Sequence, residues 1–423
     1  MQRQVNAPTK FLDKWFGQVV GRVLGGVARL LGRFGNPHLT DSPRQILLIK
    51  FCCMGDAVLV IPSLRALRTT FPNAHITMLC TPRTVAIFKE SGDLDEVKLF
   101  QLTGSRGIGE FLTAGVSALV ETLWSLRSRK FDLVVDFDNY YNWTTFIGFA
   151  TGAPTRVGFD PPGQGRRFLL TNPVRYDGDR HMVEFYLDLP RAIGADTIDK
   201  SIELPVSPET ERWALEYLAN RGLQGDGKPV VILSPGRSEA WHFIRWAEEN
   251  FVATAAGLHA RHGAHVLLMG GSAEAAIAER IAAMLAAWNV VAINLVGQTS
   301  LPQSEAVMKC ADLLICNDSG PMHIGAAMGT PTLAVFGPAN PARWGPYGAE
   351  HRVVRLDLDC SPCLFMGKLD KCPRQLLECL QVPVARVMAA AEEMLERRRA
   401  HAAQGSNRRD AGHAVIRIDG GLH

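Results

Sequence analysis

Short apolar runs alternate with stretches of helical period along most of the chain. The run "QILLIKF", from residue 45, predicts a buried strand, and a helix is predicted to follow over about 57–70. Further strands are predicted at "HITMLC", "EVKLF" and "FDLVVDF", then at "PVVILSP", "AHVLLMG", "VVAINLVG", "DLLICND" and "TLAVFG". Continuous apolar strands separated by helices are typical of parallel sheets covered on both faces. The pattern therefore predicts an α/β protein with two consecutive Rossmann-like, doubly wound sheets.

This alternation divides the chain into four segments. Residues 1–40 form an N-terminal segment, 41–205 and 206–400 the two sheet domains, and 401–423 a polar tail that we predict to be disordered. Residues 101–115 and 151–180, rich in Gly, Pro and Arg, are predicted to be loops. Two open sheets of similar size imply a cleft between them, and ligands bind beyond the carboxyl ends of such strands.

The N-terminal segment has the pattern of a basic amphipathic helix. Its apolar residues between Leu12 and Phe34 fall on one helical stripe, and four basic residues between positions 14 and 33 lie off it. Such a helix can lie in an anionic membrane surface or dock on its own domain. We favour the membrane surface, because the stripe precedes the first core strand.

Composition and charge narrow the class of protein. The chain has 423 residues and a net charge of only +3, which does not indicate a nucleic-acid binder. It contains no apolar run of the ~20 residues that a membrane span needs. A cleavable signal sequence is not expected either, so we predict the cytoplasm and reduced cysteines. The dinucleotide-binding G-x-G-x-x-G motif and the P-loop are both missing, which argues against dehydrogenases and P-loop NTPases.

Asp56 follows the first strand in "KFCCMGDAVLV". Gly55 supplies a turn there, and the carboxylate is placed where a helix begins at the expected cleft. An Asp at this position can cap the helix, an interaction worth about 1 kcal/mol. It can also serve as a general base. The residues alone leave both interpretations open.

Two stretches of the second domain offer groups for a phosphorylated ligand. In "LSPGRSEAWHFIRW", Ser234 ends a strand, and the cations Arg237, His242 and Arg245 suit phosphates; the alternative is a solvated loop. In "MGGSAEAAIAERI", Glu274 can accept hydrogen bonds from ribose hydroxyls or merely occupy the first turn of a helix.

A third stretch, "NDSGPMHIGAAMGT", begins a helix directly after the strand "DLLIC". Ser319 and Gly320 lie at the positive end of that helix, with Pro321 in its first turn, which suits a diphosphate. Asp318 precedes them and His323 follows about one turn later. A lone His is commonly a core residue, but beside this anion site we favour a ligand contact.

Together these stretches resemble glycosyltransferase family 9, the bacterial heptosyltransferases of lipopolysaccharide core assembly. The similarity rests on "MGDAVLVIPSLRAL", on "FDLVVDFDN" with "TRVGFD", and on "NDSGPMHIGAAMGTPTLAVFGPANPARWGP", in that order over residues 44–385. The resemblance implies GT-B architecture, with the acceptor on 41–205 and the nucleotide-sugar on 206–400. It also implies inverting transfer of a heptose from ADP-heptose to a lipopolysaccharide inner-core hydroxyl, with no required cofactor or metal, at the cytoplasmic face of the inner membrane.

The resemblance also implies roles for the candidate residues. Asp56 would be the general base, Glu274 would hold the ribose and Ser234 would line the phosphate site. The diphosphate and sugar would be held by Asp318, Ser319, Gly320 and His323. One position departs from the family, which often has Lys where this chain has Ile244. Arg245, Arg237 or His242 would have to supply that cation, or the donor would be another nucleotide-sugar.

Two further groups of residues could bind metal. Cys360 and Cys363 have CxxC spacing, and Cys372 and Cys379 follow; a reduced cluster or a disulfide is favoured over structural zinc. Asp136 and Asp138 form a D-x-D at a strand end, which we interpret as cleft or structural residues.

Two other functions stay open on the sequence alone. One is a non-catalytic nucleotide-sugar-binding scaffold at the membrane, which Ile244 favours and Asp56 disfavours. The other is a nucleotide-sugar epimerase of the same two-domain fold, which would convert its substrate without an acceptor.

Overall fold

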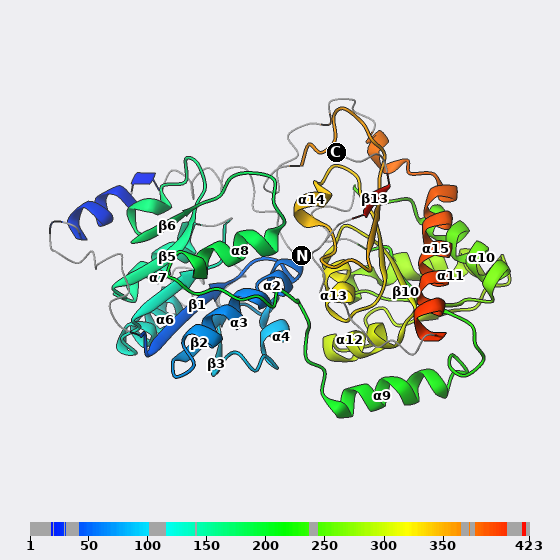
Figure 1. Ribbon diagram of the computed structural model, residues 1–423, viewed down its shortest axis with the longest axis horizontal. Helices are drawn as coiled ribbons and strands as arrows, with labels where there is room; N and C mark the ends of the chain where they lie inside the picture. The colour runs from blue at the N-terminus through cyan, green and yellow to red at the C-terminus, as the bar shows by residue number, and fades with distance from the viewer. Residues whose placement is uncertain are drawn as a thin grey trace. The chain divides into compact units, whose positions relative to one another are not determined.

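A computed structural model of the protein describes residues 18–19, 21–28, 30, 42–100, 116–139, 142–236, 244–364, 372, 377–403 and 417–419 (Figure 1). The chain divides into two compact units, Met1–Lys200 and Ser201–His423. Each unit is built on one sheet in which every strand pair is parallel. The predicted class of two Rossmann-like parallel-sheet domains is therefore confirmed.

The first sheet has the strand order β3-β2-β1-β4-β5-β6. Its strands are β1 (Gln45–Lys50), β2 (His75–Cys80), β3 (Glu96–Leu99), β4 (Leu133–Asp136), β5 (Thr155–Asp160) and β6 (Asn172–Arg175). Leu47 and Ile49 of β1 belong to a buried cluster with residues of α6 (Val116–Ser128) and α7 (Asn142–Ala150). Successive side chains of a strand point to opposite faces, so Lys50 points away from this cluster. It faces α2 (Met54–Leu59) and α8 (Met182–Arg191), which contact each other.

The remaining helices of the first unit are short or pack on α8. α3 (Ile61–Thr70) continues almost directly from α2 and contacts α8, and α4 (Val85–Phe88) contacts α2. The helix predicted over about 57–70 is thus two helices, which meet at Val60. Pro62 lies at the start of α3, where its missing N–H costs nothing.

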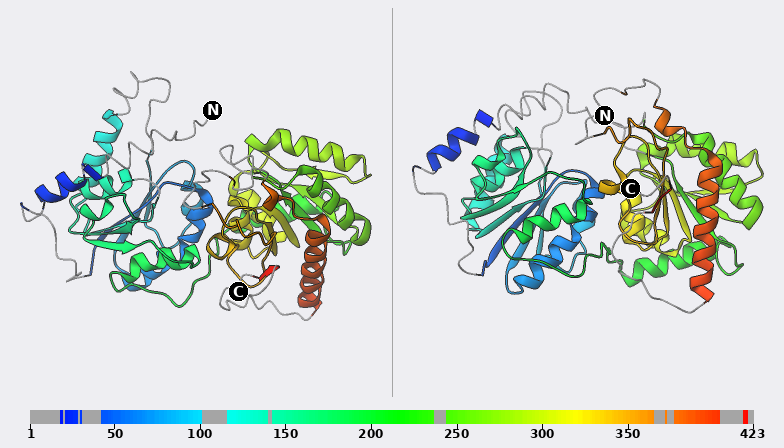
Figure 2. Two further views of the ribbon diagram at one scale, coloured as in Figure 1. Left: turned by 90° about the horizontal axis from the view of Figure 1, so that it is seen from above. Right: turned by 45° about the horizontal axis from the view of Figure 1, so that its top comes forward.

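The second sheet has the order β13-β12-β11-β10-β7-β8-β9. Its strands are β7 (Val230–Ser234), β8 (His265–Leu268), β9 (Ala292–Asn294), β10 (Leu313–Asn317), β11 (Thr332–Val335), β12 (Arg352–Val354) and β13 (Arg417–Asp419). One face packs in a single apolar cluster with α10 (Glu248–His262), α11 (Ala275–Ala286) and α15 (Val384–Ala403), which is orange-red in Figures 1 and 2. The other face carries α13 (Gly320–Ala327); α12 (Leu301–Cys310) contacts α13 and packs on α9 (Pro208–Ala219). The short helix α14 (Pro341–Trp344) precedes β12.

Each sheet reverses its strand order at one place, between β1 and β4 and between β7 and β10. Ligands of open α/β sheets bind beyond the carboxyl ends of the strands at this switch point. In the first unit, Asp56 follows β1 and Asp138 follows β4. In the second, Ser234 ends β7 and Asn317 ends β10. The topology thus brings the candidate residues of each unit to its switch point.

Several elements differ from the prediction. Residues 151–180, predicted to be loop, contain β5, the 3₁₀ helix η2 (Arg166–Phe168) and β6. β6 is an edge strand, the position at which a sheet tolerates Pro173. Directly after the predicted boundary between 205 and 206 lies α9, a helix that was not predicted; Ser207 caps it by accepting from the Thr210 N–H at 3.2 Å. Within 401–423, predicted to be disordered, α15 runs to Ala403 and β13 pairs with β12.

The described part of the N-terminal segment, residues 18–19, 21–28 and 30, is helical and appears dark blue in Figure 1. It docks on its own unit, because Gln18 Nε2 donates to Gly163 O at 2.5 Å and Arg22 lies 5.3 Å from the centre of the Phe168 ring. The rest of the segment lies outside the described residues. None of the helices in the described ranges combines the length and the hydrophobicity that crossing a bilayer requires.

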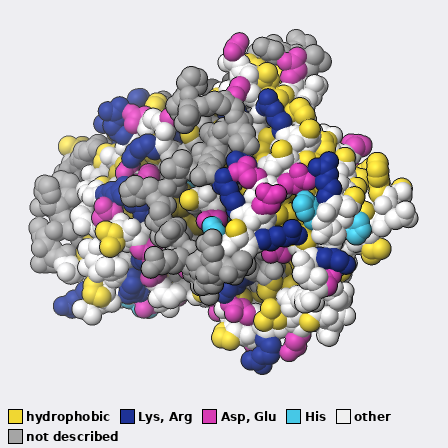
Figure 3. All heavy atoms as spheres, turned by 45° about the vertical axis from the view of Figure 1, so that its right-hand side comes forward, with side chains coloured by type: hydrophobic (Ala, Val, Ile, Leu, Met, Phe, Trp, Pro, Cys, Tyr) yellow, Lys and Arg dark blue, Asp and Glu magenta, His cyan; other side chains and the backbone are white. Residues whose placement is uncertain are grey.

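Basic and acidic side chains are mixed over the described surface visible in Figure 3. Many of them are paired, for example Arg280 with Glu248 at 2.6 Å and Arg261 with Glu392 at 2.9 Å. This mixture matches the near balance of 45 basic and 42 acidic residues in the sequence.

Candidate functional site

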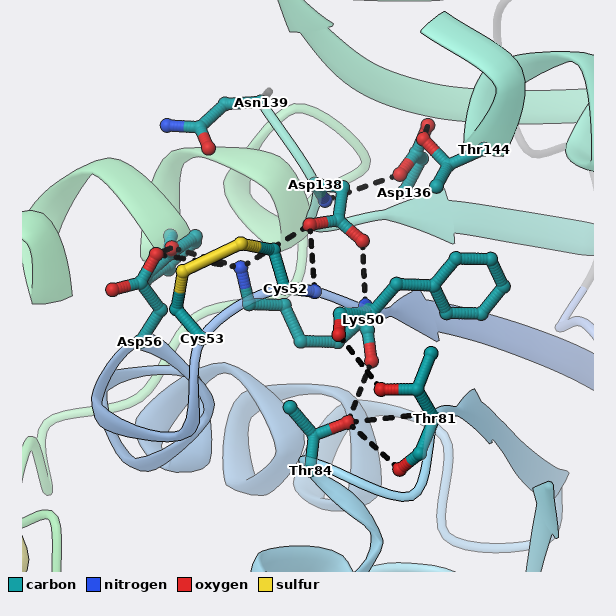
Figure 4. A network of polar contacts seen from close by, with 12 residues as sticks. Lys50, Cys52, Cys53, Asp56, Thr81, Thr84, Asp136, Asp138, Asn139 and Thr144 are labelled. Atoms are coloured by element: carbon teal, nitrogen blue, oxygen red, sulfur yellow. Dashed lines mark hydrogen bonds and ion pairs between the residues drawn. A yellow bond between two sulfur atoms is a disulfide. The ribbon is translucent and has the colours of Figure 1, made fainter. Parts of the chain in front are cut away.

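A buried ammonium between two carboxylates lies at the switch point of the first sheet (Figure 4). Lys50 Nζ is 3.7 Å from Asp56 Oδ2 and 3.5 Å from Asp138 Oδ1. The Lys50 side chain is fully buried, whereas Asp56 retains 7% of its surface. Of the three charged groups, Asp56 is therefore the one that solvent or a ligand can reach.

Tyr186 completes this group from α8. Its hydroxyl accepts from Lys50 Nζ at 3.3 Å and donates to Asp56 Oδ2 at 3.3 Å. The backbone beside Lys50 is also held, because Thr84 Oγ1 donates to Lys50 O at 3.1 Å and Thr81 Oγ1 donates to Phe51 O at 2.8 Å. The Asp56 carboxylate is thus oriented by two side chains from elements that are far apart in the sequence.

Asp56 does not act as a helix cap. The N-cap of α2 is Cys53, and no side-chain cap hydrogen bond is formed there among the described residues. The side-chain partners of Asp56 are Tyr186 and Lys50 instead. Burial raises the pKa of Asp56 to about 6, Lys50 lowers it and the nearby Asp138 raises it. A carboxylate whose pKa lies this close to neutrality is suited to accept a proton.

The two carboxylates of the D-x-D have structural partners. Asp138 Oδ2 accepts from the Phe51 N–H at 2.6 Å and braces the loop that leads into α2, the helix that carries Asp56. Asp136 accepts from the hydroxyls of Thr144 and Thr145 and forms a buried ion pair with Arg166 of η2. These contacts agree with the structural interpretation of the D-x-D, since both carboxylates already have buried cationic partners.

The loop before α2 contains an unexpected bond. Cys52 and Cys53 form a disulfide between adjacent residues, and Cys53 has a φ of 64°, which non-glycine residues seldom adopt (Figure 4). The prediction of reduced cysteines is therefore wrong for this pair. The other seven cysteines are free thiols.

In the second unit, Asn317 joins the two strands of the switch point. Its Oδ1 accepts from the Trp246 N–H at 2.9 Å, and its Nδ2 donates to Pro235 O at 2.7 Å. Because Asn317 is buried at the end of β10, these bonds fix the ends of β7 and β10 relative to each other. Asp318 and Ser319 follow directly.

The start of α13 matches the predicted position. Ser319 is the N-cap, but its side chain makes no cap hydrogen bond within the described residues; its Oγ donates to Asn317 O at 3.2 Å. Asp318, Ser319 and Gly320 are half-buried, and His323 is buried one turn into the helix. Backbone N–H groups at such a helix start favour an anion.

Glu274 lies beside the ends of β7 and β8. A Cβ atom at Gly236 or at Gly270 would overlap its carboxylate, so a larger residue at either position would displace the Glu274 side chain. Its Oε2 accepts from the Gly271 N–H at 2.8 Å. Burial raises the pKa of Glu274, although the Gly271 N–H and the Arg245 guanidinium both lower it. Ser234 lies on the neighbouring strand, and its buried Oγ has no hydrogen-bond partner within the described ranges.

The position that departs from the family pattern lies in the core. Ile244 is 1% exposed, whereas the adjacent Arg245 is half-buried and lines a surface hollow with Pro235 and Arg280. Of the three cations suggested as substitutes for the family's Lys, Arg245 is close enough to Glu274 to lower the pKa of its carboxyl. Arg237 and His242 lie outside the described residues.

The C-terminal cysteines are close enough to influence one another. Burial and the neighbouring cysteines raise the pKa of Cys363. The same two causes raise the pKa of Cys379 to about 11. Across the described ranges, no group of three or more His, Cys, Asp or Glu side chains is arranged to hold a metal ion. The zinc alternative for Cys360, Cys363, Cys372 and Cys379 gains no support from this geometry.

Three residues at the switch points of the two sheets were not predicted from the sequence: Lys50, Tyr186 and Asn317. A signal existed for Lys50, because a Lys in an otherwise apolar buried strand needs a buried partner. For Tyr186, the apolar spacing of Met182, Phe185 and Leu189 indicates a helix that buries it. Asn317 occupies the end of a buried strand, where its amide must also be satisfied.

Solved structures share this fold. A glycosyltransferase family 9 protein from Veillonella parvula is 23% identical, with a TM-score of 0.67, over 84% of this chain and 98% of its own. The ADP-heptose lipopolysaccharide heptosyltransferase II of Escherichia coli is 22% identical, with a TM-score of 0.59, over 82% and 99%. The two Rossmann-like units of this chain thus have the GT-B architecture of glycosyltransferases.

The sequence comparison identifies the family. Residues 121–373 match the model of glycosyltransferase family 9 (heptosyltransferase), which is more than half of the chain. The lipopolysaccharide core heptosyltransferase OpsX of Haemophilus influenzae is 21% identical over 75% of this chain and 86% of its own length. The chain belongs to glycosyltransferase family 9 and is a glycosyltransferase.

Proposed function

We propose that the protein transfers a heptose from ADP-heptose to a sugar hydroxyl of the lipopolysaccharide inner core, with Asp56 as general base. Family membership and the names of the relatives support the donor and acceptor. The observation that carries the catalytic role is the geometry of Asp56, a partly accessible carboxylate at the switch point with two buried partners, Lys50 and Tyr186.

In the proposed reaction, the Asp56 carboxylate takes the proton of the acceptor hydroxyl. The acceptor oxygen forms a bond to the anomeric carbon while the bond from that carbon to the ADP oxygen breaks. ADP departs with the electron pair, and the anomeric configuration is inverted. A well-placed base of this kind contributes about 10²–10⁴-fold in rate.

The donor site that we propose is formed by the second unit. The N–H groups at the start of α13 would bind the diphosphate, beside Asp318, Ser319, Gly320 and His323. Glu274 would accept from the ribose hydroxyls, and Ser234 would donate its hydroxyl, which has no partner among the described residues, to a phosphate oxygen. Arg245, whose guanidinium lowers the pKa of Glu274, would replace the family's Lys. We also assign Arg237 and His242 to donor binding.

Calorimetric titration with ADP-heptose, ADP, UDP and GDP tests the donor assignment. We expect ADP-heptose and ADP to bind more tightly than UDP and GDP. Glu274→Gln should weaken ADP-heptose binding by about tenfold or more, because hydrogen bonds to a charged group contribute about 1.5–3 kcal/mol. Glu279→Gln, on the exposed face of α11, is the matched control and should bind normally. A preference for UDP or GDP would contradict the ADP-heptose assignment.

We further propose that the N-terminal helix is a docking surface for an anionic membrane. It contacts its own unit through Gly21, Gly25 and Ala28, and a Cβ at Gly25 would overlap the backbone of Phe168. The opposite side exposes apolar side chains, at Val19, Val23, Leu24, Val27 and Leu30. Docking on its own domain and membrane binding are therefore compatible, since they use opposite sides.

Charge indicates the kind of membrane. Between positions 10 and 34 the sequence has Lys10, Lys14, Arg22, Arg29 and Arg33, with Asp13 as the sole acidic residue. Basic residues next to an apolar stripe favour anionic lipid surfaces. A lipopolysaccharide acceptor carries its core sugars on a lipid, so a membrane surface would concentrate enzyme and acceptor together.

The membrane proposal predicts the behaviour of a triple variant, Val19→Ser with Val23→Ser and Val27→Ser. Its binding to vesicles containing phosphatidylglycerol should fall by about tenfold or more, because each buried Val contributes up to ~1.5 kcal/mol. Cosedimentation measures the bound fraction. Val291→Ser removes a similarly exposed Val from the second unit and should bind as the wild type does. Equal binding of the triple variant and the wild type would contradict the proposal.

A further inference from the structure

We infer that Lys50 is a positioning residue for the base, holding the Asp56 carboxylate ionised and oriented from the buried end of β1. This inference rests on the proposed role of Asp56. Lys50 itself has a fully buried side chain, so it acts through Asp56 and does not itself touch a ligand.

The position of Lys50 is imposed by the sheet. β1 pairs with β2 on one side and β4 on the other, and the alternation of its side chains directs Lys50 toward α2 and α8. Thr84 fixes its carbonyl, and its ammonium contacts Asp56, Asp138 and Tyr186. Side-chain freedom is small in so enclosed a position, which gives Asp56 a fixed partner.

The charges do not cancel within this group. One ammonium serves two carboxylates, and Asp138 is additionally held by the N–H groups of Phe51 and Cys52. Asp138 therefore has several donors, whereas Asp56 has the shared Lys50 and the Tyr186 hydroxyl. Losing Lys50 would leave Asp56 buried beside a like charge, a situation that favours its protonated form.

The groups that face Asp56 come from several elements. Lys50 comes from β1 and Asp138 from the segment after β4, while Cys52 and Cys53 lie in the loop before α2, the helix that carries Asp56 (Figure 4). Tyr186 comes from α8. Burial raises the pKa of Asp56 to about 6 in the presence of Lys50, which lowers it. Removing the ammonium should move that pKa upward, and removing the Tyr186 hydroxyl should move it upward by less.

The test is the pH profile of kcat/KM for Lys50→Met. A base is active when deprotonated, so activity rises with pH through the pKa of Asp56. We expect the acidic limb of the profile to move up by about one pH unit or more, which is a tenfold loss on that limb per unit. Activity should recover at high pH, and Lys50→Arg should keep the limb closer to that of the wild type. A uniform loss at all pH values with an unshifted limb would overturn the inference.

Two further variants keep the test decisive. Leu48→Met changes a buried residue on the same face of β1 without changing charge and should leave the limb in place. If Lys50→Met does not fold, Tyr186→Phe replaces it, and an unshifted limb there overturns the inference. Failure of the base assignment can be told apart from failure of the Lys50 inference. If Asp56 is not the base, Asp56→Asn retains wild-type turnover, independently of the result for Lys50→Met.

Discussion

Replacing Asp56 with Asn is expected to lower kcat by about 10²–10⁴-fold and to leave the affinity for ADP-heptose unchanged. Asn has nearly the same shape and can still accept from Tyr186, but it cannot take a proton from the acceptor hydroxyl. The proposed donor groups, Glu274 and Ser319 among them, belong to the second unit, whereas Asp56 belongs to the first.

This expectation is checked by measuring turnover and donor binding on the same preparations. Asp95→Asn is a suitable control, since Asp95 is a partly exposed carboxylate of the first unit that pairs with Arg68. It should keep wild-type turnover. In the wild-type enzyme, the acidic limb of kcat/KM should have its midpoint near pH 6, the pKa to which burial raises Asp56. Turnover by Asp56→Asn at the wild-type rate would show that another group accepts the proton.

The largest effect on stability is expected from Arg166→Met. The Arg166 side chain is fully buried, donates to the Asp136 carboxylate and to Asp138 O, and reaches Thr145 Oγ1 at 2.7 Å. Breaking a buried ion pair leaves an uncompensated charge and costs about 3–5 kcal/mol. Because Asp138 braces the loop that leads into α2 and Asp56, part of the activity should be lost as well.

The neighbouring residue supplies the control for this variant. Arg167 is largely exposed and lies 3.7 Å from Asp160, a surface ion pair worth about 0–1 kcal/mol. Amide hydrogen exchange of β1 and β4 reports on the first unit directly, so the free energy of opening can be compared between the two variants. Equal protection in Arg166→Met and Arg167→Met would contradict the structural role given to the Asp136–Arg166 pair.

The sequence predicted the layout of both sheets because their central strands are buried on both faces. "QILLIKF" and "DLLICND" are nearly continuous apolar runs, which distinguishes them from loops. β5 and β6 escaped prediction since their segment mixes Gly, Pro and Arg, and β6 is a four-residue edge strand.

The site was predictable where a residue follows a strand, and not where it reaches the site from elsewhere. Asp56, Ser234 and Asp318 could be located from the strands they follow. Tyr186 comes from a helix more than a hundred residues after Asp56 and contacts it only through the fold. The pairing of Lys50 with two carboxylates depends likewise on β4 lying beside β1.

The most direct measurement is a transfer assay with wild-type protein, ADP-heptose and a lipopolysaccharide inner-core acceptor that lacks the heptose. Mass spectrometry of the acceptor and detection of released ADP follow the two products together. We expect the acceptor to gain the mass of one heptosyl residue for each ADP released, with the anomeric configuration inverted. An unchanged acceptor in the presence of ADP-heptose, or transfer only from a different nucleotide-sugar, would contradict the proposed heptosyl transfer.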